Sequence, residues 1–178
     1  MAQRRILILA AVAILCVAGC LRASVYVQTD EGWTSYASTA GFSVLAPAPL
    51  RETVQVLNNP NLGPIETHFL VTTTPAGVRY AVVYGDFPAS YVASTDVLGD
   101  SRDGDARSLK AAATNEQRLT VSGRPALDYR IETTNNVRRE RLILDGMRLY
   151  AMTVTGTAEA ADGDDARKFL DSFALSAR

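Results

Sequence analysis

Residues that build crosslinks and metal sites are scarce in this chain. Its 178 residues include two cysteines, Cys16 and Cys20, one histidine, His68, and one tryptophan. Both cysteines fall within the first twenty residues, so no disulfide framework can stabilise the remainder, which must rely on packing. Structural metal sites usually need three or four converging ligands. We therefore predict neither a metal centre nor a bound cofactor.

An excess of charge of one sign is missing as well. The chain has 18 Lys and Arg against 19 Asp and Glu, a formal net charge of −1. No basic face is available to attract nucleic acid, and there is no acidic tail. Internal repeats and low-complexity blocks are also absent from the sequence, which indicates one ordinary globular domain.

Long hydrophobic runs are limited to one, at the N-terminus. Arg4 and Arg5 precede the uncharged apolar stretch Ile6–Gly19. A membrane-spanning helix needs about 17–25 apolar residues, so this stretch is short for a span. A basic start, an apolar centre and small residues before the cut are typical of a cleaved secretory signal.

Cys20 closes the run Val17-Ala18-Gly19-Cys20, which resembles the lipobox of bacterial lipoproteins. The resemblance implies that a diacylglyceryl group alkylates the thiol and that cleavage follows Gly19. Two or three acyl chains would hold the protein at a membrane, facing outside the cytoplasm. Leu21 replaces the aspartate that often signals inner-membrane retention, which favours the outer membrane over the cell membrane. The alternatives are a plain signal peptide, or an uncleaved anchor, in which Cys20 has no role.

The lipobox divides the chain into three predicted parts. Residues 1–19 form a lipoprotein signal peptide, residues 20–40 the lipid anchor and tether, and residues 41–178 the folded domain. The tether contains Trp33, a residue type that packs more often than it serves as a ligand platform. We therefore expect the end of the tether to dock on the domain.

Short strands in hairpin order dominate the predicted domain. Alternating apolar and polar residues mark the strands, and Pro, Gly and Asn mark the turns between them. The strands cover residues 42–45, 53–57, 65–74, 78–84, 118–121, 127–132, 137–144 and 147–155. The last has apolar side chains on both faces, which predicts a central strand. Asp145-Gly146 before it predicts a type I′ turn.

Two helical regions accompany these strands. Residues 94–113 have a helical composition, as one helix or as two short pieces. At the C-terminus a helix follows Asp164 or Asp165, either of which can cap it through its side chain. Its apolar face comprises Ala166, Phe169, Leu170 and Phe173. The predicted fold class is therefore α+β, a mostly antiparallel β-sheet flanked by helices.

Five stretches of the domain resemble the PsbP-like superfamily of α/β/α sandwiches, and most of all its uncharacterised bacterial lipoprotein members. They are Gly41-Phe42-Ser43-Val44 leading into Ala46-Pro47, Ile65-Glu66-Thr67-His68, Tyr84-Gly85-Asp86-Phe87-Pro88, Arg148-Leu149-Tyr150-Ala151-Met152 and Arg167-Lys168-Phe169-Leu170-Asp171-Ser172-Phe173. The resemblance spans nearly the whole domain. It implies a binding or assembly subunit, as is the extrinsic protein of photosystem II, rather than an enzyme. It supplies no catalytic residues, and it implies no photosynthetic role here.

Catalytic motifs are missing from the sequence. His68 lies two residues from Glu66, so both side chains share one face of a strand. Such a pair can hold a metal or act as a base, but a lone strand histidine is more often a surface polar residue. Neither Gly-x-Ser-x-Gly nor Ser-x-x-Lys occurs. We predict that the chain is not an enzyme.

Charged residues gather in three places. Two acidic clusters lie around Gly104 and Gly163, and a basic group lies within one strand. Their members are Asp100, Asp103 and Asp105; Asp162, Asp164 and Asp165; and Arg138, Arg139 and Arg141. The acidic spacing does not match a calcium loop, so we expect helix caps, with loose cation binding as the alternative. For the arginines we expect a solvated face, with a charged docking patch as the alternative.

The sequence favours a lipid-anchored cell-envelope protein with a non-catalytic domain that binds an envelope protein partner or assists assembly. The alternative is a carrier of a small or lipid-like ligand, with a cavity lined by residues such as Tyr80, Tyr84, Tyr129 and Tyr150. A hydrolase ranks last.

Overall fold

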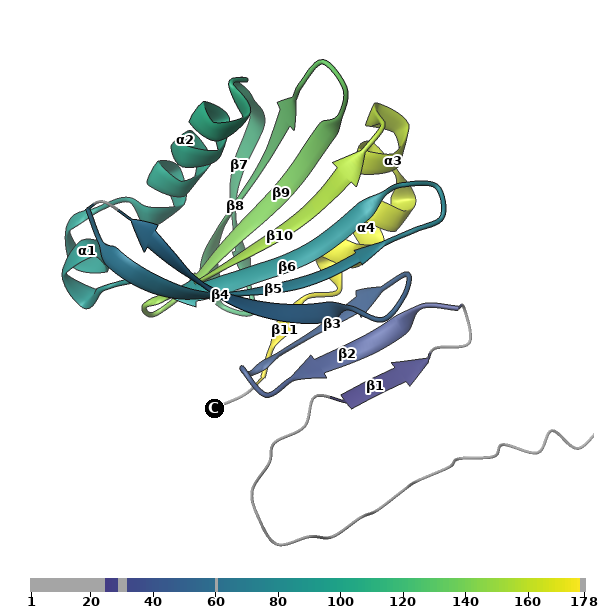
Figure 1. The fold of residues 1–178 in the computed structure, drawn as a ribbon, viewed down its shortest axis with the longest axis horizontal. Coiled ribbons are helices and arrows are strands. Elements are labelled where there is room, and N and C mark those ends of the chain that lie inside the picture. Colours follow the sequence, from purple (N-terminus) through teal and green to yellow (C-terminus); the bar gives the residue numbers. More distant parts are fainter. Residues whose placement is uncertain (1–24, 29–31, 60, 177–178) are drawn as a thin grey trace, which may run out of the picture.

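Two antiparallel sheets form the body of the protein (Figure 1). The computed structural model describes residues 25–28, 32–59 and 61–176. The large sheet has seven strands in the order β4-β5-β6-β10-β9-β8-β7, and the small sheet has four in the order β1-β2-β3-β11. With helices packed against the large sheet, the α+β class predicted from the sequence is confirmed.

The elements follow one another mostly as hairpins. The strands are β1 (Val25–Gln28), β2 (Thr34–Ser38), β3 (Phe42–Ala46), β4 (Arg51–Asn59), β5 (Gly63–Thr73), β6 (Arg79–Asp86), β7 (Ala113–Val121), β8 (Arg124–Glu132), β9 (Val137–Asp145), β10 (Arg148–Gly156) and β11 (Ala174–Leu175). The helices are α1 (Ala89–Ser94), α2 (Val97–Leu109), α3 (Ala158–Asp162) and α4 (Asp164–Asp171). Among the described residues, no helix is long and apolar enough to span a membrane.

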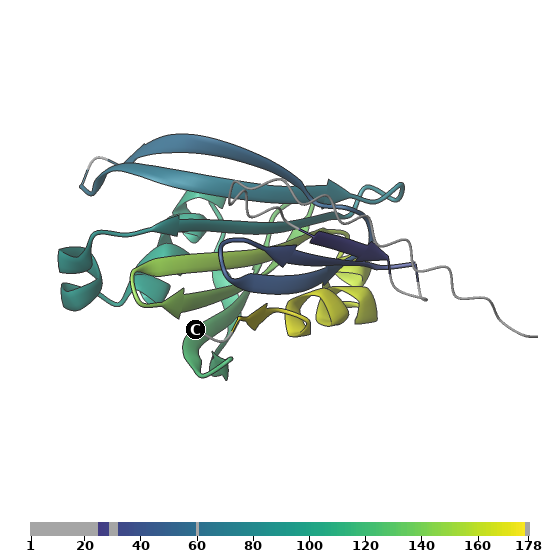
Figure 2. The same ribbon diagram turned by 90° about the horizontal axis from the view of Figure 1, so that it is seen from below.

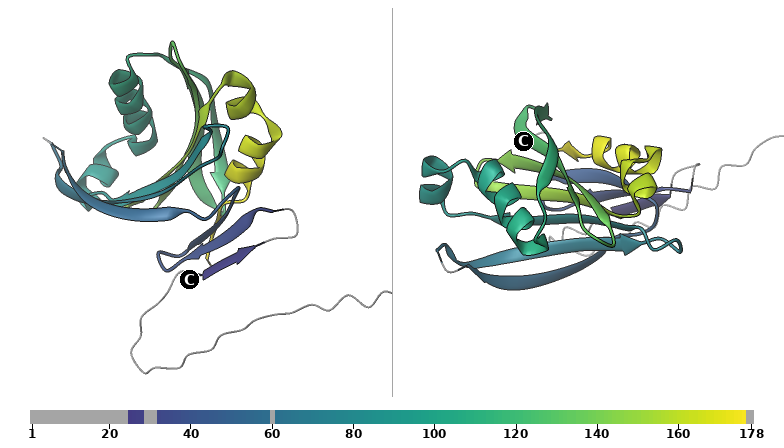
Figure 3. Two further views of the ribbon diagram at one scale, coloured as in Figure 1. Left: turned by 45° about the vertical axis from the view of Figure 1, so that its right-hand side comes forward. Right: turned by 90° about the horizontal axis from the view of Figure 1, so that it is seen from above.

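Helices lie on opposite faces of the large sheet (Figure 3). Helix α2 packs on β7, β8 and β9, and we call this side the α2 face. Helix α3 packs on β9 and β10, and α4 lies between β10 and β3 of the small sheet; we call this side the α4 face. Each face has its own hydrophobic core, so the sheet is covered on both sides near its centre.

The apolar stripe of the last helix builds the core of the α4 face. All of its predicted residues are buried, as the 3.6-residue period requires of a helix that packs along one side. They are Ala166, Phe169, Leu170 and Phe173. The ring of Phe173 stacks on Phe42 of β3 with centroids 5.4 Å apart, which joins the C-terminus to the small sheet.

Strand β10 is central, as its two apolar faces predicted. It pairs with β6 on one side and β9 on the other. Tyr150, Met152 and Val154 are buried in the core of the α4 face, while Leu149 belongs to that of the α2 face. The turn before it differs from the prediction, because Asp145 pairs with Arg148 and leaves Gly146 and Met147 as the loop. Gly146 has φ of 63°, whereas Met147 has no positive φ, so the turn is not type I′.

Packed strands begin before Gly41, where the sequence predicts the domain to start. Strand β2 pairs with β3 over its whole length, and β1 pairs with β2. Tyr36 is only 1% exposed and Trp33 only 8%, so both belong to the core. The expected docking of Trp33 is therefore confirmed. The sequence did not show β2, because its five residues are mostly small and polar.

The region between β6 and β8 holds two helices, which is one of the two arrangements that the sequence predicted. Strand β7 follows them and starts at Ala113, whereas the sequence predicted a start at Arg118. Helix α2 ends at Leu109, and its C-cap Lys110 has a left-handed φ of 54°. Strand β7 pairs with β8 through a register shift between Thr114 and Gln117, and Asn115 has φ of 53°. Residues 114–118 are all polar, so the first half of the strand shows no apolar–polar alternation in the sequence.

Candidate functional site

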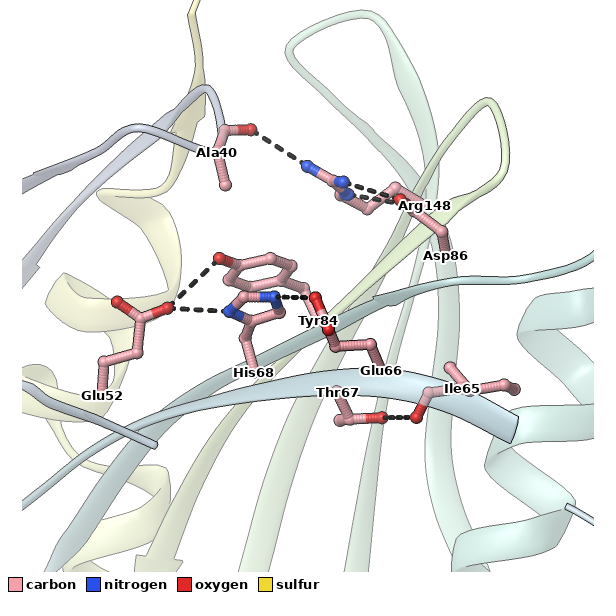
Figure 4. Close-up of polar contacts among 9 residues, drawn as sticks. All are labelled: Ala40, Glu52, Ile65, Glu66, Thr67, His68, Tyr84, Asp86 and Arg148. Carbon is pink, nitrogen blue, oxygen red and sulfur yellow. Dashed lines mark hydrogen bonds and ion pairs between the residues drawn. The ribbon is translucent and has the colours of Figure 1, made fainter. Parts of the chain in front are cut away.

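A cluster of polar side chains surrounds His68 on the α4 face, toward the β4 edge of the large sheet. We call it the histidine cluster. It comprises Glu52 of β4, Glu66 and His68 of β5, Tyr84 and Asp86 of β6, and Arg148 of β10 (Figure 4). Register places His68 opposite Tyr84, which in turn lies opposite Tyr150. Because directly paired residues share a face of the sheet, strands far apart in sequence bring these side chains together.

His68 is held between two carboxylates. Its Nδ1 lies 2.8 Å from Oε1 of Glu52, and its Nε2 lies 3.4 Å from Oε1 of Glu66 (Figure 4). The sequence predicted that Glu66 shares the face of His68, and this is confirmed. Glu52 was missed, because it comes from the neighbouring strand, sixteen residues earlier. Both ring nitrogens therefore face carboxylates, and the imidazole bridges β4 and β5.

Tyr84 forms the floor beneath this histidine. The two rings stack with centroids 4.4 Å apart and an interplanar angle of 7°. The Tyr84 hydroxyl donates to Oε1 of Glu52 over 3.4 Å. Burial, together with the Glu52 carboxylate, raises the pKa of Tyr84 well above that of a free phenol. The phenol therefore stays protonated and acts as a hydrogen-bond donor rather than as a base.

Arg148 closes the cluster on the other side of Tyr84. Its Nε and Nη2 each donate to Asp86 over 2.7 Å, a bidentate pair, and its guanidinium lies 5.3 Å from the Tyr84 ring centroid. The hydrogen bonds from Arg148 lower the pKa of Asp86. Arg148 also donates to the carbonyl of Ala40 over 3.4 Å, which ties the large sheet to the turn between β2 and β3.

The charged groups of the histidine cluster are thus paired with one another. Its open space is about 120 Å³, lined in part by Glu66, His68 and Arg148. In the part of the chain that the structure describes, no group of three or more His, Cys, Asp or Glu residues is arranged to hold a metal ion. The geometry suits a cross-strand polar network more than a reaction centre.

A separate apolar hollow of about 300 Å³ opens on the α2 face. Strand β5 pairs with β6 only as far as Thr67, opposite Gly85, whereas β4 and β5 stay paired out to Asn59 and Gly63. The end of this hairpin therefore leaves the sheet. The hollow lies where the β4–β5 hairpin separates from β6. It is lined mainly by Leu57, Ile65, Val83, Phe87, Leu149 and Ala151. None of its lining residues is charged.

The cavity that we predicted for a carrier is not the one observed. Of the four tyrosines named for it, only Tyr84 borders the apolar hollow. Tyr80 and Tyr150 are buried in the core of the α4 face. Tyr129 lies on the other face of the sheet, where its hydroxyl donates to Asp105 of α2 over 2.6 Å. Alternation along the strands places Tyr129 on the opposite face from the other three, which pack in one core instead of lining a cavity.

The first acidic cluster lies inside α2, with Asp100 in the first turn and Asp103 and Asp105 further along, so the expected caps are wrong there. Gly104 is a helical residue, and Asp96 caps the helix by accepting from the backbone N–H of Gly99 over 3.2 Å. Asp100 accepts from the Tyr91 hydroxyl over 3.0 Å, and Asp103 lies 2.7 Å from a nitrogen of Arg102. These carboxylates point to separate partners and do not form a cation site.

The second acidic cluster is also dispersed. Asp162 accepts from Arg130 over 3.2 Å, and Asp164 pairs with Arg167. Gly163 is the N-cap of α4, and no side chain caps this helix, so the predicted Asp cap is wrong. Asp164 and Asp165 instead lie in the first turn, where their charge is favourable to the helix dipole.

The arginine-rich stretch of β9 is not a solvated face. Arg141 is 8% exposed, and its Nε and Nη2 donate to both oxygens of the buried Asp128 over 2.7 and 2.8 Å. Its Nη1 donates to the carbonyl of Leu170 and to Asp171 in α4. The expectation failed because helices pack on both faces of β9, which buries Arg141 and leaves Arg138 and Arg139 only partly exposed.

Glu140 lies on the other face of the same strand, beneath α2. It is 1% exposed, and its Oε2 lies 2.6 Å from Nε of Arg138. Asp105 of α2 lies beside this pair and accepts from the hydroxyl of Tyr129. Burial is the main cause that raises the pKa of Glu140 to about 8, and the Asp105 charge adds to it.

Cys20, the predicted lipidation site, lies outside the described residues, as does the whole predicted signal peptide. The lipid anchor therefore stays a prediction from sequence.

Known proteins were compared with the chain by sequence and by structure. No family model matches it, and neither does any curated protein. Among solved structures, cyanobacterial PsbP (CyanoP) from Synechocystis sp. PCC 6803 superimposes with a TM-score of 0.54 over 90% of this chain and 98% of that chain. The fold is PsbP-like. At 13% sequence identity, this similarity establishes the architecture alone.

A second solved structure is more distant from the chain. It is a protein of unknown function from Pseudomonas aeruginosa, with a TM-score of 0.37 and 14% identity over 73% of this chain and 86% of that one. The PsbP-like fold therefore rests on the cyanobacterial structure, and it confirms the architecture that the sequence resemblance implied.

Proposed function

We propose that the protein is a lipid-anchored component of the bacterial cell envelope whose PsbP-like domain acts by binding a protein partner rather than by catalysis. The observation that favours a non-catalytic role is that the charged side chains of the histidine cluster pair with one another. Both nitrogens of His68 face carboxylates, and Arg148 is engaged by Asp86. A general base or nucleophile needs a free partner atom that can reach a substrate, and these groups are already committed to one another.

The sequence supports the anchoring half of the proposal. Arg4 and Arg5, the apolar stretch and the residues Val17 to Cys20 follow the order of a lipoprotein signal. Two acyl chains bind a bilayer far more firmly than one, since each buried CH₂ contributes about 0.8 kcal/mol. The mature protein would then work at a membrane surface, with its domain outside the cytoplasm.

Replacing Cys20 with serine tests the anchor. Serine cannot form the thioether, so the variant is expected to leave the membrane fraction or to keep its leader. Fractionation and the intact mass of the N-terminal peptide measure both outcomes, and Cys16→Ser is the matched control that should stay processed and membrane-bound. A Cys20→Ser variant that fractionates and migrates like the parent would exclude lipidation.

Cross-linking in cells tests the binding role. We expect the full chain to be captured with a protein of different sequence, and capture to fall at least fivefold when one exposed charged surface is reversed. Arg79→Glu and Glu159→Lys are suitable substitutions, because both residues are exposed and lie on different elements. If neither the parent nor any variant yields a specific partner, the proposed binding role fails.

The apolar hollow favours a second candidate, a carrier of a small uncharged apolar ligand. Its volume lies at the lower end for ligand sites, and its uncharged lining suits a lipid-like molecule. Native mass spectrometry of the full chain should then show a bound molecule, and Val83→Phe, which fills the hollow, should remove it. Val71→Phe, on the same face of the neighbouring strand β5, serves as control. A parent chain without added mass would eliminate this candidate.

A further inference from the structure

The two edge strands of the large sheet differ sharply. Strand β4 forms one edge, and all nine of its residues are exposed. It lies at the outer margin of the molecule, and none of the described elements lies beyond it (Figure 2). Three of its apolar side chains, Val54, Val56 and Leu57, are 51%, 59% and 45% exposed. An open edge presents unpaired backbone N–H and C=O groups to any extended chain of suitable sequence.

Strand β7, the opposite edge, has the features that usually prevent such pairing. A bulge interrupts its register between Thr114 and Gln117, and Asn115 has a left-handed φ. Glu116 and Arg118 place charges in the middle of the strand. Strand β4 has neither a bulge nor a central charge, because its pairing with β5 is regular and its only charges are Arg51 and Glu52 at one end. The β4 edge is therefore left unprotected.

The sequence of β4 is complementary to a second copy of itself. If two β4 strands pair antiparallel about a twofold axis normal to the sheet, Gln55 of one copy lies opposite Gln55 of the other. Val54 of each copy then faces Val56 of the other, because residues paired in this way share a face. Arg51 lies opposite Asn59 and Glu52 opposite Asn58, so no like charges meet.

Other registers are less favourable. A shift of two residues in either direction shortens the overlap at its ends. One shift places Val56 opposite Glu52, and the other places Val54 opposite Asn58. The register centred on Gln55 is the one that uses all nine residues and buries four valines against one another. It is also isologous, as a closed dimer requires.

From this complementarity we propose that the protein forms a homodimer through antiparallel pairing of the two β4 strands, centred on Gln55. The two large sheets then become continuous, and the exposed valines of β4 are covered. The proposal is independent of lipidation and of the heterologous partner, because it depends only on residues of the described domain.

Cysteine cross-linking of the full chain tests this register. Gln55→Cys is expected to give a covalent dimer on oxidation or with a short bifunctional thiol reagent, because the two positions face each other across the axis. Thr53→Cys is the matched control: its two copies would lie four residues apart along the strands, roughly 13 Å at about 3.3 Å per residue, and should not link. Gln117→Cys, on the protected edge, should not link either. The parent chain measures any background cross-linking through its own cysteines.

The strength of the association gives a second measurement. Val56→Lys places a charge in the centre of the interface and should raise the dimer dissociation constant at least tenfold in light scattering or sedimentation. Because Val56 is 59% exposed in one copy, the fold should survive, and circular dichroism verifies this. Equal linking at Gln55 and Gln117, or a parent chain that stays monomeric across the concentration range, would overturn the proposal.

Discussion

Replacing Arg141 with methionine is expected to lower the free energy of unfolding by about 3–5 kcal/mol. The substitution leaves Asp128, 8% exposed, as a buried carboxylate without its bidentate donor. Loss of one member of a buried pair costs more than the pair contributes, because the remaining charge is desolvated and unpaired. The carbonyl of Leu170 loses the donor Arg141 as well, which weakens the attachment of α4 to the sheet.

Urea unfolding followed by circular dichroism measures this effect. Arg139→Met is the matched control on the same strand, because Arg139 is only partly buried, and it should change stability by less than about 1 kcal/mol. The double variant Arg141→Met with Asp128→Leu removes both charges and should recover much of the loss. If Arg141→Met alone is as stable as the control, Asp128 and Arg141 do not form a buried pair.

Replacing Glu140 with glutamine is expected to flatten the dependence of stability on pH. Burial beneath α2 raises the pKa of Glu140 to about 8, above its value in an unfolded chain. Between these two pKa values the folded state binds more protons than the unfolded state, so the parent is most stable at low pH and loses stability as pH rises toward 8. Over the whole window the loss is on the order of 5 kcal/mol, since one pKa unit corresponds to about 1.4 kcal/mol.

The charged neighbours of Glu140 determine how the pH dependence of stability is interpreted. Arg138 favours the ionised form, whereas Asp105 opposes it, and Tyr129 donates to Asp105. Unfolding in urea at pH 5, 6, 7 and 8 gives the slope for the parent and the variant. Glu159→Gln, an exposed carboxylate, should leave the slope unchanged. A Glu140→Gln protein that keeps the slope of the parent would show that Arg138 holds Glu140 ionised throughout this range.

The fold could be predicted where the spacing of apolar residues along an element matches the side of that element that is buried. The apolar residues of the last helix recur every three or four positions up to Phe173, which predicted a core helix. Strand β10 has apolar residues on both faces, which predicted a central strand. Strand β11 has only two residues, too few to show any period, and residues 114–118 of β7 are all polar. Strand β11 and the first half of β7 were missed for these reasons.

The candidate site was less predictable, because its contacts depend on strand order. The pairing of His68 with Glu66 follows from their spacing, but its pairing with Glu52 needs the register of β4 with β5. In the same way, the charges of Arg141 and Glu140 suggested a solvated strand. Only the placement of helices on both faces of β9 shows that the strand is enclosed. Charge alone does not reveal burial when the partners come from distant elements.

The pairing of β11 with β3 has a consequence for how the protein is made. The residues that complete the small sheet, and the helix that fills the core beside it, are the last of the described chain to leave the ribosome. Until they arrive, Phe42 and its aromatic neighbours stay uncovered, and the core of the α4 face is incomplete. This core therefore forms only after α4 and β11 have been synthesised, whereas the core of the α2 face needs neither of them.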